Sequence, residues 1–202
     1  MKPRKRTAIL ISGRGSNMAA LIAAARVPDF PAEIALVLSN KPDAPGLALA
    51  KNAGIAVAAV DHKIYAGRDE FEASLQAMLD IHRIELICLA GFMRILSPAF
   101  VERWSGRILN IHPSLLPDLR GLKTHERALA EGRSGHGCTV HYVSADLDAG
   151  PVIVQARVPV LTGDDAETLA ARVLIEEHRI YPLALDKVAR QLRVAGARAA
   201  QA

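Results

Sequence analysis

Residues 7–25 read TAILISGRGSNMAALIAAA, and this stretch decides the class of fold. The run Thr7–Ser12 is short and apolar, which favours a buried strand. A turn with two glycines follows, and the stretch from Asn17 to about Ala25 favours a helix. A strand that leads through a short turn directly into a helix is the repeating unit of an α/β sheet.

The same alternation of strand and helix continues through the first half of the chain. The links between the expected elements are short, so the strands should run parallel with helices on both faces. The sequence therefore predicts an α/β fold built on an open, mostly parallel twisted sheet. Further strands are expected at 34–39, 56–60, 84–90 and 107–111, and helices at 44–53 and 69–82.

The pattern changes in the second half. Residues 136–143 and 152–160 predict two longer strands that pair antiparallel or extend the sheet, and 164–187 predicts one or two long helices. We find no internal repeat and no linker long enough to divide the chain, so a single domain over 1–202 is expected. Residues 1–6 form a basic arm and those from about 195 to 202 a tail, and we expect both to be disordered.

Composition narrows the class of protein. The 202 residues are 50% hydrophobic but only 4% aromatic, which predicts an aliphatic core, and no apolar run reaches the length of a membrane span. Much of the net charge of +4 lies at the two ends, and no basic stripe with aromatic residues runs between them. We therefore expect an anionic small-molecule substrate, with no nucleic acid and no membrane as a partner. Two cysteines in strand-like runs indicate no disulfide framework and a reduced, cytoplasmic protein.

A glycine-rich loop follows the first strand. Gly13, Gly15, Ser16 and Asn17 stand where the next helix begins, and the start of a helix presents free N–H groups and a positive dipole end to an anion. The pattern is neither a Walker sequence nor a complete dinucleotide fingerprint, because Met18 replaces the third glycine. We favour phosphate binding over the alternative, a tight turn that only caps the helix.

The segment NIHPSLLP, 110–117, carries candidate catalytic groups. Asn110 and His112 lie two residues apart at a strand end, so both side chains point to the same side. Pro113 disfavours the helical region for His112 and helps to keep it extended. An amide donor beside an imidazole suits a reaction in which a carbonyl oxygen gains negative charge while a proton moves. The alternative is a structural histidine next to a turn.

Two loops complete the expected site. Asp148, in the turn DLDAGP at 146–151, could orient His112 and favour its protonated form, although an Asx-type turn is the alternative. The segment GFMRIL at 91–96 follows a strand on the edge where α/β sheets bind ligands, and its apolar side chains around Arg94 suit a flat, partly apolar ligand. A packed hydrophobic loop is the alternative there.

The remaining histidines and cysteines predict no metal site. His136 and Cys138 share a side of their expected strand, whereas His141 faces away from them, and no fourth ligand stands at a familiar spacing. Both thiols are expected to be buried, which argues against a cysteine nucleophile.

Together these motifs resemble those of the phosphoribosylglycinamide formyltransferases, a family of folate-dependent enzymes of purine biosynthesis. The similarity extends from Ile9 to about Leu185, and its motifs occur in the family's order and spacing. They are ILISGRGSN, LAGFMRILSP, NIHPSLLP, HGCTVHYV, LDAGPVI and EEHRIYPL.

The resemblance implies a Rossmann-like formyltransferase fold and transfer of the formyl group of 10-formyltetrahydrofolate to the primary amine of glycinamide ribonucleotide. It implies a tetrahedral intermediate stabilised by Asn110 and His112, with Asp148 assisting proton transfer, and no metal. It leaves open whether the protein is a monomer or a homodimer. By the same resemblance, the substrate phosphate is bound by Gly15, Ser16 and Asn17, the rest of the ribonucleotide by Glu177, and the folate by Arg68, Met93, Arg94, Ile95, Leu96 and Asn110.

Other proteins share parts of this pattern. Methionyl-tRNA formyltransferases have the same core with a further C-terminal domain, and formyltetrahydrofolate hydrolases usually carry an N-terminal regulatory domain. With 202 residues and a first strand at about Thr7, the chain is expected to have neither. A non-catalytic protein that binds a nucleotide phosphate would need the glycine loop but not the set of Asn110, His112 and Asp148.

Overall fold

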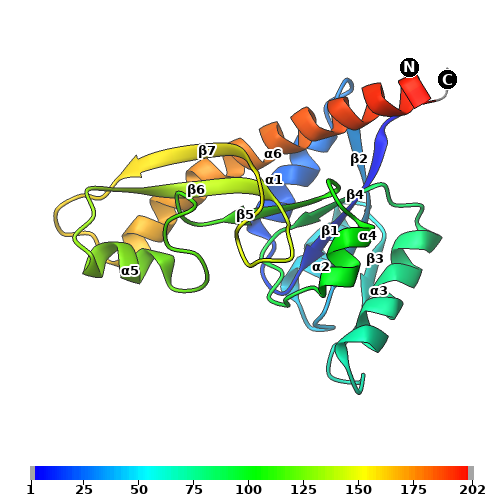
Figure 1. Ribbon diagram of the computed structural model, residues 1–202, viewed down its shortest axis with the longest axis horizontal. Helices are drawn as coiled ribbons and strands as arrows, with labels where there is room; N and C mark the ends of the chain where they lie inside the picture. The colour runs from blue at the N-terminus through cyan, green and yellow to red at the C-terminus, as the bar shows by residue number, and fades with distance from the viewer. Residues whose placement is uncertain (1–2, 200–202) are drawn as a thin grey trace.

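A computed structural model describes residues 3–199, which are built around one sheet of seven strands (Figure 1). The strands are β1 (Lys5–Ile11), β2 (Ala32–Ser39), β3 (Val57–Ala59), β4 (Leu86–Leu89), β5 (Ile108–His112), β6 (Gly135–Tyr142) and β7 (Val152–Pro159). Their order is β3-β2-β1-β4-β5-β6-β7. The strands β1 to β5 are parallel, whereas β6 and β7 are antiparallel. The predicted open, mostly parallel α/β sheet is confirmed.

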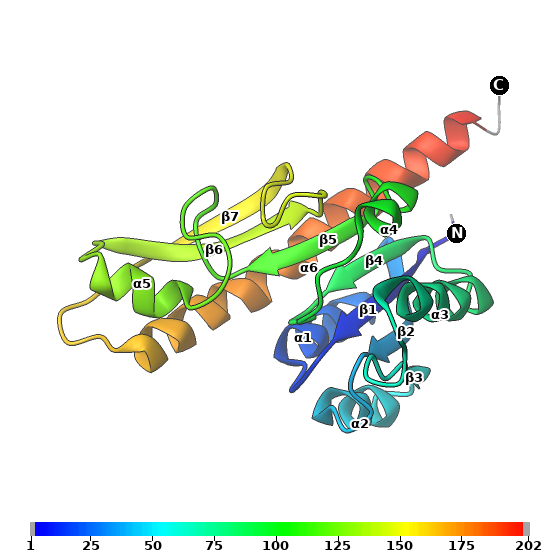
Figure 2. The same ribbon diagram turned by 60° about the horizontal axis from the view of Figure 1, so that its bottom comes forward.

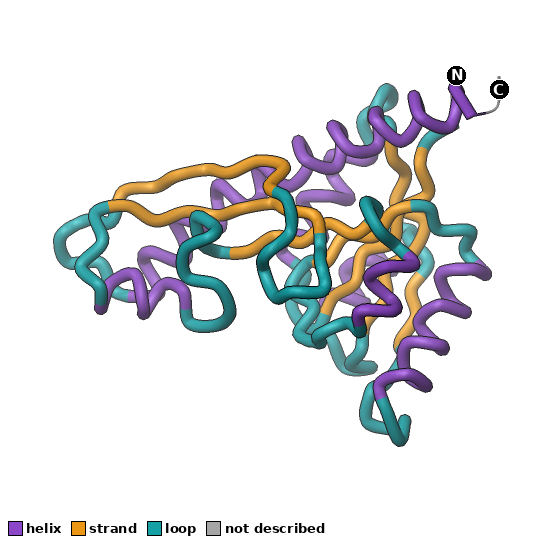
Figure 3. The backbone as a smooth tube through the Cα atoms, viewed as in Figure 1, coloured by secondary structure: helices purple, strands orange, loops and turns teal. Residues whose placement is uncertain are grey.

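Helices cover both faces of this sheet (Figures 2 and 3). They are α1 (Ser16–Ala25), α2 (Pro45–Asn52), α3 (Arg68–Ile81), α4 (Pro98–Arg103), α5 (Thr124–Ala130) and α6 (Ala166–Ala199). Alternate residues of β1 divide the core: Ile9 and Ile11 pack on one face with α1, α2 and α6, and Ala8 and Leu10 pack on the other with α3 and α4. The prediction of helices on both faces is therefore confirmed. None of them, within residues 3–199, is both long and apolar enough to cross a membrane.

The strand order places a switch point between β1 and β4. The chain goes from β1 outward to β2 and β3, then returns to β4 on the other side of β1 and continues to β5. Loops that leave the carboxyl ends of two such neighbouring strands diverge and open a crevice between them. The loops after β1, β4 and β5 all lie on this edge, so the sheet gathers the candidate site residues there.

The antiparallel strands extend the sheet beside β5. Asn110 of β5 lies directly opposite His141 of β6. The connection between β6 and β7 reaches back to β5. This is shown by Asp148 of that connection, which contacts His112 at the end of β5. The structure thus settles how these two strands pair and carries a distant loop to the parallel half of the site.

At both ends of the described chain, regular secondary structure extends further than the sequence predicted. The basic arm expected over 1–6 instead contributes Lys5 and Arg6 to β1, where Lys5 Nζ lies 2.7 Å from Glu85 and Arg6 Nη1 2.6 Å from Glu33. The expected tail is part of α6 as far as Ala199. The positive charges of Lys5 and Arg6 are compensated by carboxylates of adjacent segments, so these two residues can belong to the strand. Residues 1–2 and 200–202 of the arm and tail lie outside the described residues.

Candidate active site

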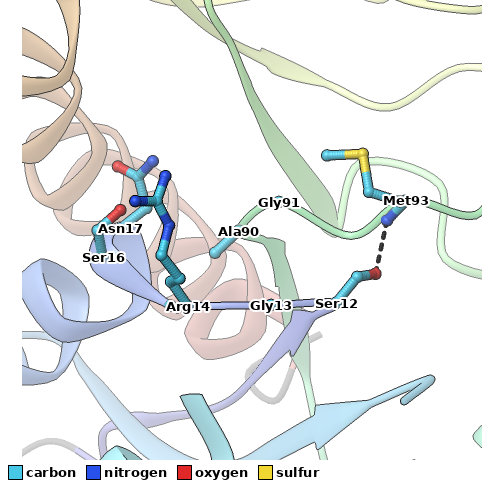
Figure 4. A pocket seen from close by; sticks show the side chains of 9 residues that line it. Ser12, Gly13, Arg14, Ser16, Asn17, Ala90, Gly91 and Met93 are labelled. Carbon is cyan, nitrogen blue, oxygen red and sulfur yellow. Dashed lines mark hydrogen bonds between the residues drawn. The ribbon is translucent and has the colours of Figure 1, made fainter. Parts of the chain in front are cut away.

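Two cavities open beside each other at the carboxyl edge of the parallel strands. The smaller, about 280 Å³, is lined by residues 12–17 together with Ala90, Gly91 and Met93 (Figure 4). The larger, about 790 Å³, is lined by parts of the segments 89–96, 110–113, 121–125 and 141–148. Gly91 and Met93 line both, so the two cavities share a wall.

The smaller cavity is formed around the start of α1. Gly15 has a φ of 79°, and a Cβ there would lie 2.9 Å from Met18 Cε and 3.2 Å from Gly46 Cα, so the turn needs glycine. No side chain of residues 3–199 caps the first N–H groups of α1, which begins at Ser16. The side chain of Arg14 extends beside Ser16 and Asn17 (Figure 4). Free N–H groups, a helix start and a guanidinium give this cavity the properties of an anion site.

Asn17 connects this cavity to α6. Its Nδ2 donates to Glu177 Oε2 at 2.6 Å, and its Oδ1 is buried without a hydrogen-bond partner in the described part of the chain. Burial raises the pKa of Glu177, and the hydrogen bond from Asn17 opposes that rise. The structure therefore brings Gly15, Ser16, Asn17 and Glu177 together. Asn17 Oδ1 lacks a hydrogen-bond donor, and a bound ligand could supply one.

The loop after β4 forms an apolar wall of the larger cavity. Met93 and Ile95 are 64% and 62% exposed although both are large apolar residues, and Arg94 between them is exposed as well. Leu96 lines the cavity but is buried in the core against α3 and α4. Arg68 is exposed at the start of α3 and lies outside the lining of both cavities. Of the predicted folate residues, the structure thus places Met93, Arg94, Ile95, Leu96 and Asn110 at the larger cavity.

His112 and Asp148 meet in the floor of the larger cavity. His112 Nδ1 lies 3.3 Å from Asp148 Oδ2, and the two side chains are 7% and 8% exposed. The same carboxylate oxygen accepts from the backbone N–H of Gly121 at 2.9 Å. Asp148 has a φ of 49°, a conformation that non-glycine residues seldom adopt, so the loop holds this carboxylate in place at a conformational cost.

The proton positions on His112 follow from its partners. Its Nε2 lies 2.9 Å from the carbonyl oxygen of Leu119, which can only accept, so Nε2 carries a proton. Its Nδ1 faces the carboxylate of Asp148, which also accepts when ionised. The contact with Asp148 becomes an ion pair when the ring carries a proton on both nitrogens.

His141 is a site residue that the sequence analysis missed. Its Nδ1 donates to the carbonyl of Tyr142 at 2.8 Å, so its Nε2 accepts from Asn110 Nδ2 at 3.2 Å. Burial lowers the pKa of His141, which keeps this ring neutral, although the carboxylate of Asp148 opposes the shift. His141 thus orients the Asn110 amide and leaves its second N–H free. Pairing with the strand that carries Asn110 was the signal, but the sequence left that pairing open.

Two further histidines, His125 and His136, form a pair near His112. His136 Nε2 is 3.1 Å from His125 Nδ1, and burial together with His125 lowers the pKa of His136 to about 4. Both rings are neutral at pH 7, since the pKa of His125 is lowered by its own burial. Thr124, next to His125 in the lining, has a buried hydroxyl without a partner among residues 3–199.

Metal and thiol chemistry find no support in these side chains. Within residues 3–199, no group of three His, Cys, Asp or Glu side chains could hold a metal ion. Burial raises the pKa of both Cys88 and Cys138 to about 12, so neither thiol is a nucleophile at neutral pH.

The open α/β sheet thus carries a pocket around a helix start beside Asn110, His112 and Asp148. The formyl transferase family model matches residues 5–185, and the chain belongs to that family. Phosphoribosylglycinamide formyltransferase from Escherichia coli K12 is 48% identical over 178 residues, which are 88% of this chain and 84% of the relative. A crystal structure of the enzyme of that name from Brucella melitensis superposes with a TM-score of 0.89 at 56% identity, covering 93% of this chain and 96% of the other.

Other relatives are much longer than this chain. The human trifunctional purine biosynthetic protein adenosine-3 is 50% identical over 188 residues, which are 93% of this chain but 19% of the relative. The chain therefore spans about a fifth of the length of that trifunctional protein.

Proposed function

We propose that this protein transfers a formyl group from 10-formyltetrahydrofolate to the primary amine of glycinamide ribonucleotide, a step of purine biosynthesis. The observation that carries the proposal is that an anion pocket and a larger, partly apolar cavity share a wall beside Asn110, His112 and Asp148. The high identity to a phosphoribosylglycinamide formyltransferase that matches nearly the whole chain supports the choice of substrates. We further propose that the chain forms a single domain and is cytoplasmic. We also propose that it acts as a monomer or homodimer and binds neither metal nor nucleic acid.

The smaller cavity is the proposed site of the ribonucleotide phosphate. Its ligands are the backbone N–H groups at Gly15 to Asn17 and the hydroxyl of Ser16, with Arg14 as a further positive charge. Glu177, which accepts from Asn17, is placed to bind the ribose or glycinamide part.

The larger cavity is the proposed site of the formyl donor. Its volume of about 790 Å³ is in the range of pockets for ligands of drug size, and the exposed side chains of Met93 and Ile95 suit a flat ring system. Arg94 is placed to meet a carboxylate of the donor. Arg68 would meet the donor only where it extends beyond the cavity lining.

The polar groups at the junction suit a tetrahedral intermediate. Attack of the amine on the formyl carbon leaves an oxyanion and a protonated amine. The free N–H of Asn110 donates to the oxyanion, and removing one such donor typically costs about 10²–10³ in rate. A protonated His112 stabilises the oxyanion through its positive charge, because its two ring nitrogens face Leu119 and Asp148. A proton then passes from the attacking nitrogen to the leaving nitrogen through His112 or a water held by Asp148, a step that contributes roughly 10²–10⁴. The oxyanion collapses to a carbonyl, the bond between the formyl carbon and the folate nitrogen breaks, and tetrahydrofolate leaves.

The direct test is incubation of the protein with 10-formyltetrahydrofolate and glycinamide ribonucleotide while the folate absorbance is followed. We expect turnover that depends on both substrates. Absence of turnover by a folded sample would overturn the proposal. Formyl loss in a control without the ribonucleotide would indicate a hydrolase, and turnover in a parallel incubation with methionyl-tRNA alone would indicate a different acceptor.

A further inference from the structure

Ser12 lines the smaller cavity, and the proposed function gives its side chain no role. It follows β1 directly, next to β4 at the switch point of the sheet, and is 6% exposed. Its hydroxyl donates to Asn40 Oδ1 at 2.5 Å and accepts from the backbone N–H of Met93 at 2.7 Å (Figure 4). A serine hydroxyl has one proton and two lone pairs, so it can make both hydrogen bonds at once.

These contacts tie together the loops after three neighbouring strands. Asn40 follows β2, Ser12 follows β1 and Met93 lies in the loop after β4. The backbone N–H of Ser12 also donates to the carbonyl of Gly91 at 3.1 Å. The segment from Gly91 to Met93 is therefore held against Ser12 by one backbone and one side-chain hydrogen bond.

The segment that Ser12 holds is the shared wall. Gly91 and Met93 line both the smaller and the larger cavity. A displacement of this segment would change the shape of both cavities together. Ser12 is thus the side chain through which the glycine loop and the apolar wall are fixed relative to each other.

The far end of the same loop is held differently. The backbone N–H and hydroxyl of Ser97 donate to the buried carboxylate of Glu72, and the Ser97 oxygen also accepts from the N–H of Phe100. Ser97 lines neither cavity, and its neighbour Leu96 lines only the larger. Removal of the Ser97 hydroxyl would therefore disturb the larger cavity at most.

We propose that Ser12 is a positioning residue that holds the Met93 backbone and so sets the geometry of the acceptor and donor pockets together. The assignment of the two pockets to the ribonucleotide and the formyl donor rests on the proposed function. The hydrogen-bond clamp itself is independent of it. In Ser12→Ala the Met93 N–H loses its acceptor, and the shared wall is held only by the backbone bond to Gly91.

Steady-state kinetics give the first test. For Ser12→Ala we expect the KM values of both substrates to rise by a similar factor, about 2- to 10-fold, with a smaller change in kcat. Ser12→Thr, which keeps the hydroxyl, should restore both. The matched control Ser97→Ala deletes the same group at the other end of the loop and should leave the KM for the ribonucleotide at the wild-type value. An unchanged KM for either substrate in Ser12→Ala, or equal effects of the two alanine variants, would overturn the proposal.

Amide hydrogen exchange gives a test that needs no activity. The Met93 amide should exchange faster in Ser12→Ala than in the wild type, and at the wild-type rate in Ser97→Ala. An unchanged Met93 rate in Ser12→Ala would overturn the clamp even in an active enzyme. If the wild type catalyses no formyl transfer, the proposed function fails, whereas faster exchange at Met93 would still support the clamp.

Discussion

The two cavities share a wall, yet they are built in different ways. Most of the smaller one comes from the continuous stretch Ser12–Asn17, in which a strand end, a glycine turn and a helix start follow one another. The larger one draws on several separate segments between Leu89 and Asp148, and its polar pair joins the end of β5 to the loop after β6. The first cavity is a local property of the backbone, whereas the second depends on strand pairing and on one returning loop.

We expect the largest effect from removing the negative charge of Asp148 in the larger cavity. Asp148→Asn keeps an oxygen to accept from Gly121 but removes the negative charge that faces His112. We expect kcat to fall by about 10²–10⁴ with little change in either KM, since proton movement and not binding is affected. Steady-state kinetics and a thermal melt on the same sample check this. A kcat within twofold of the wild type, with the fold intact, would exclude the proposed role.

A substitution in the smaller cavity should change the KM of one substrate only. Ser16→Ala removes a hydroxyl at the start of α1, where we propose that the phosphate binds. Hydrogen bonds to charged groups contribute about 1.5–3 kcal/mol, so the KM for the ribonucleotide should rise roughly 10- to 100-fold. The KM for the formyl donor should stay within about twofold on the same reasoning. Equal increases for both substrates would count against a phosphate site here.

The pair of His125 and His136 beside the larger cavity should make the free energy of unfolding depend on pH. The pKa of His136 is lowered from 6.5 to about 4, so between these values the unfolded chain binds a proton that the folded chain does not. Stability therefore falls as the pH decreases through that window. We expect a loss of about 1–2 kcal/mol more in the wild type than in His136→Phe, measured by urea unfolding at pH 7 and pH 4.5. Identical losses in the two proteins would contradict the assignment.

The smallest effect concerns the orientation of Asn110. His141→Phe removes the ring nitrogen that accepts from the Asn110 amide. Because one neutral hydrogen bond is worth about 1 kcal/mol, we expect kcat to fall about fivefold. His141→Gln, whose amide oxygen can accept the same bond, should recover part of the loss. If both variants match the wild type in kcat, Asn110 needs no support from His141.

The strands and helices of the parallel half follow from the sequence because their apolar patterns are local. The strand predicted at Thr7–Ser12 is β1 with its start moved to Lys5, and the helix predicted at 69–82 is α3 at Arg68–Ile81. The start of β1 was misjudged because carboxylates from other segments pair with Lys5 and Arg6. Helix α5 (Thr124–Ala130) was missed because its seven residues carry too short a pattern to recognise.

The candidate site divides in the same way. The position of Ser16 and Asn17 at a helix start, and of Asn110 and His112 on one side of a strand, needed only local geometry. The contact between His112 and Asp148 could be suggested from residue type but not established, because 36 residues and an antiparallel strand pair separate them. The catalytic and binding roles of all these residues stay predictions that the variants above address.

The sequence by itself determined the class of the sheet, the glycine turn before α1, and the position of an amide and an imidazole on the same side of the end of β5, since each depends on neighbours within a few positions. Only the tertiary structure decided that His141 orients Asn110, that Leu119 fixes one proton of His112, and that Ser12 holds the wall between the cavities. Those contacts join residues of different strands and loops. They form when the strands and loops pack together and buried polar groups must find partners, which no local pattern can specify.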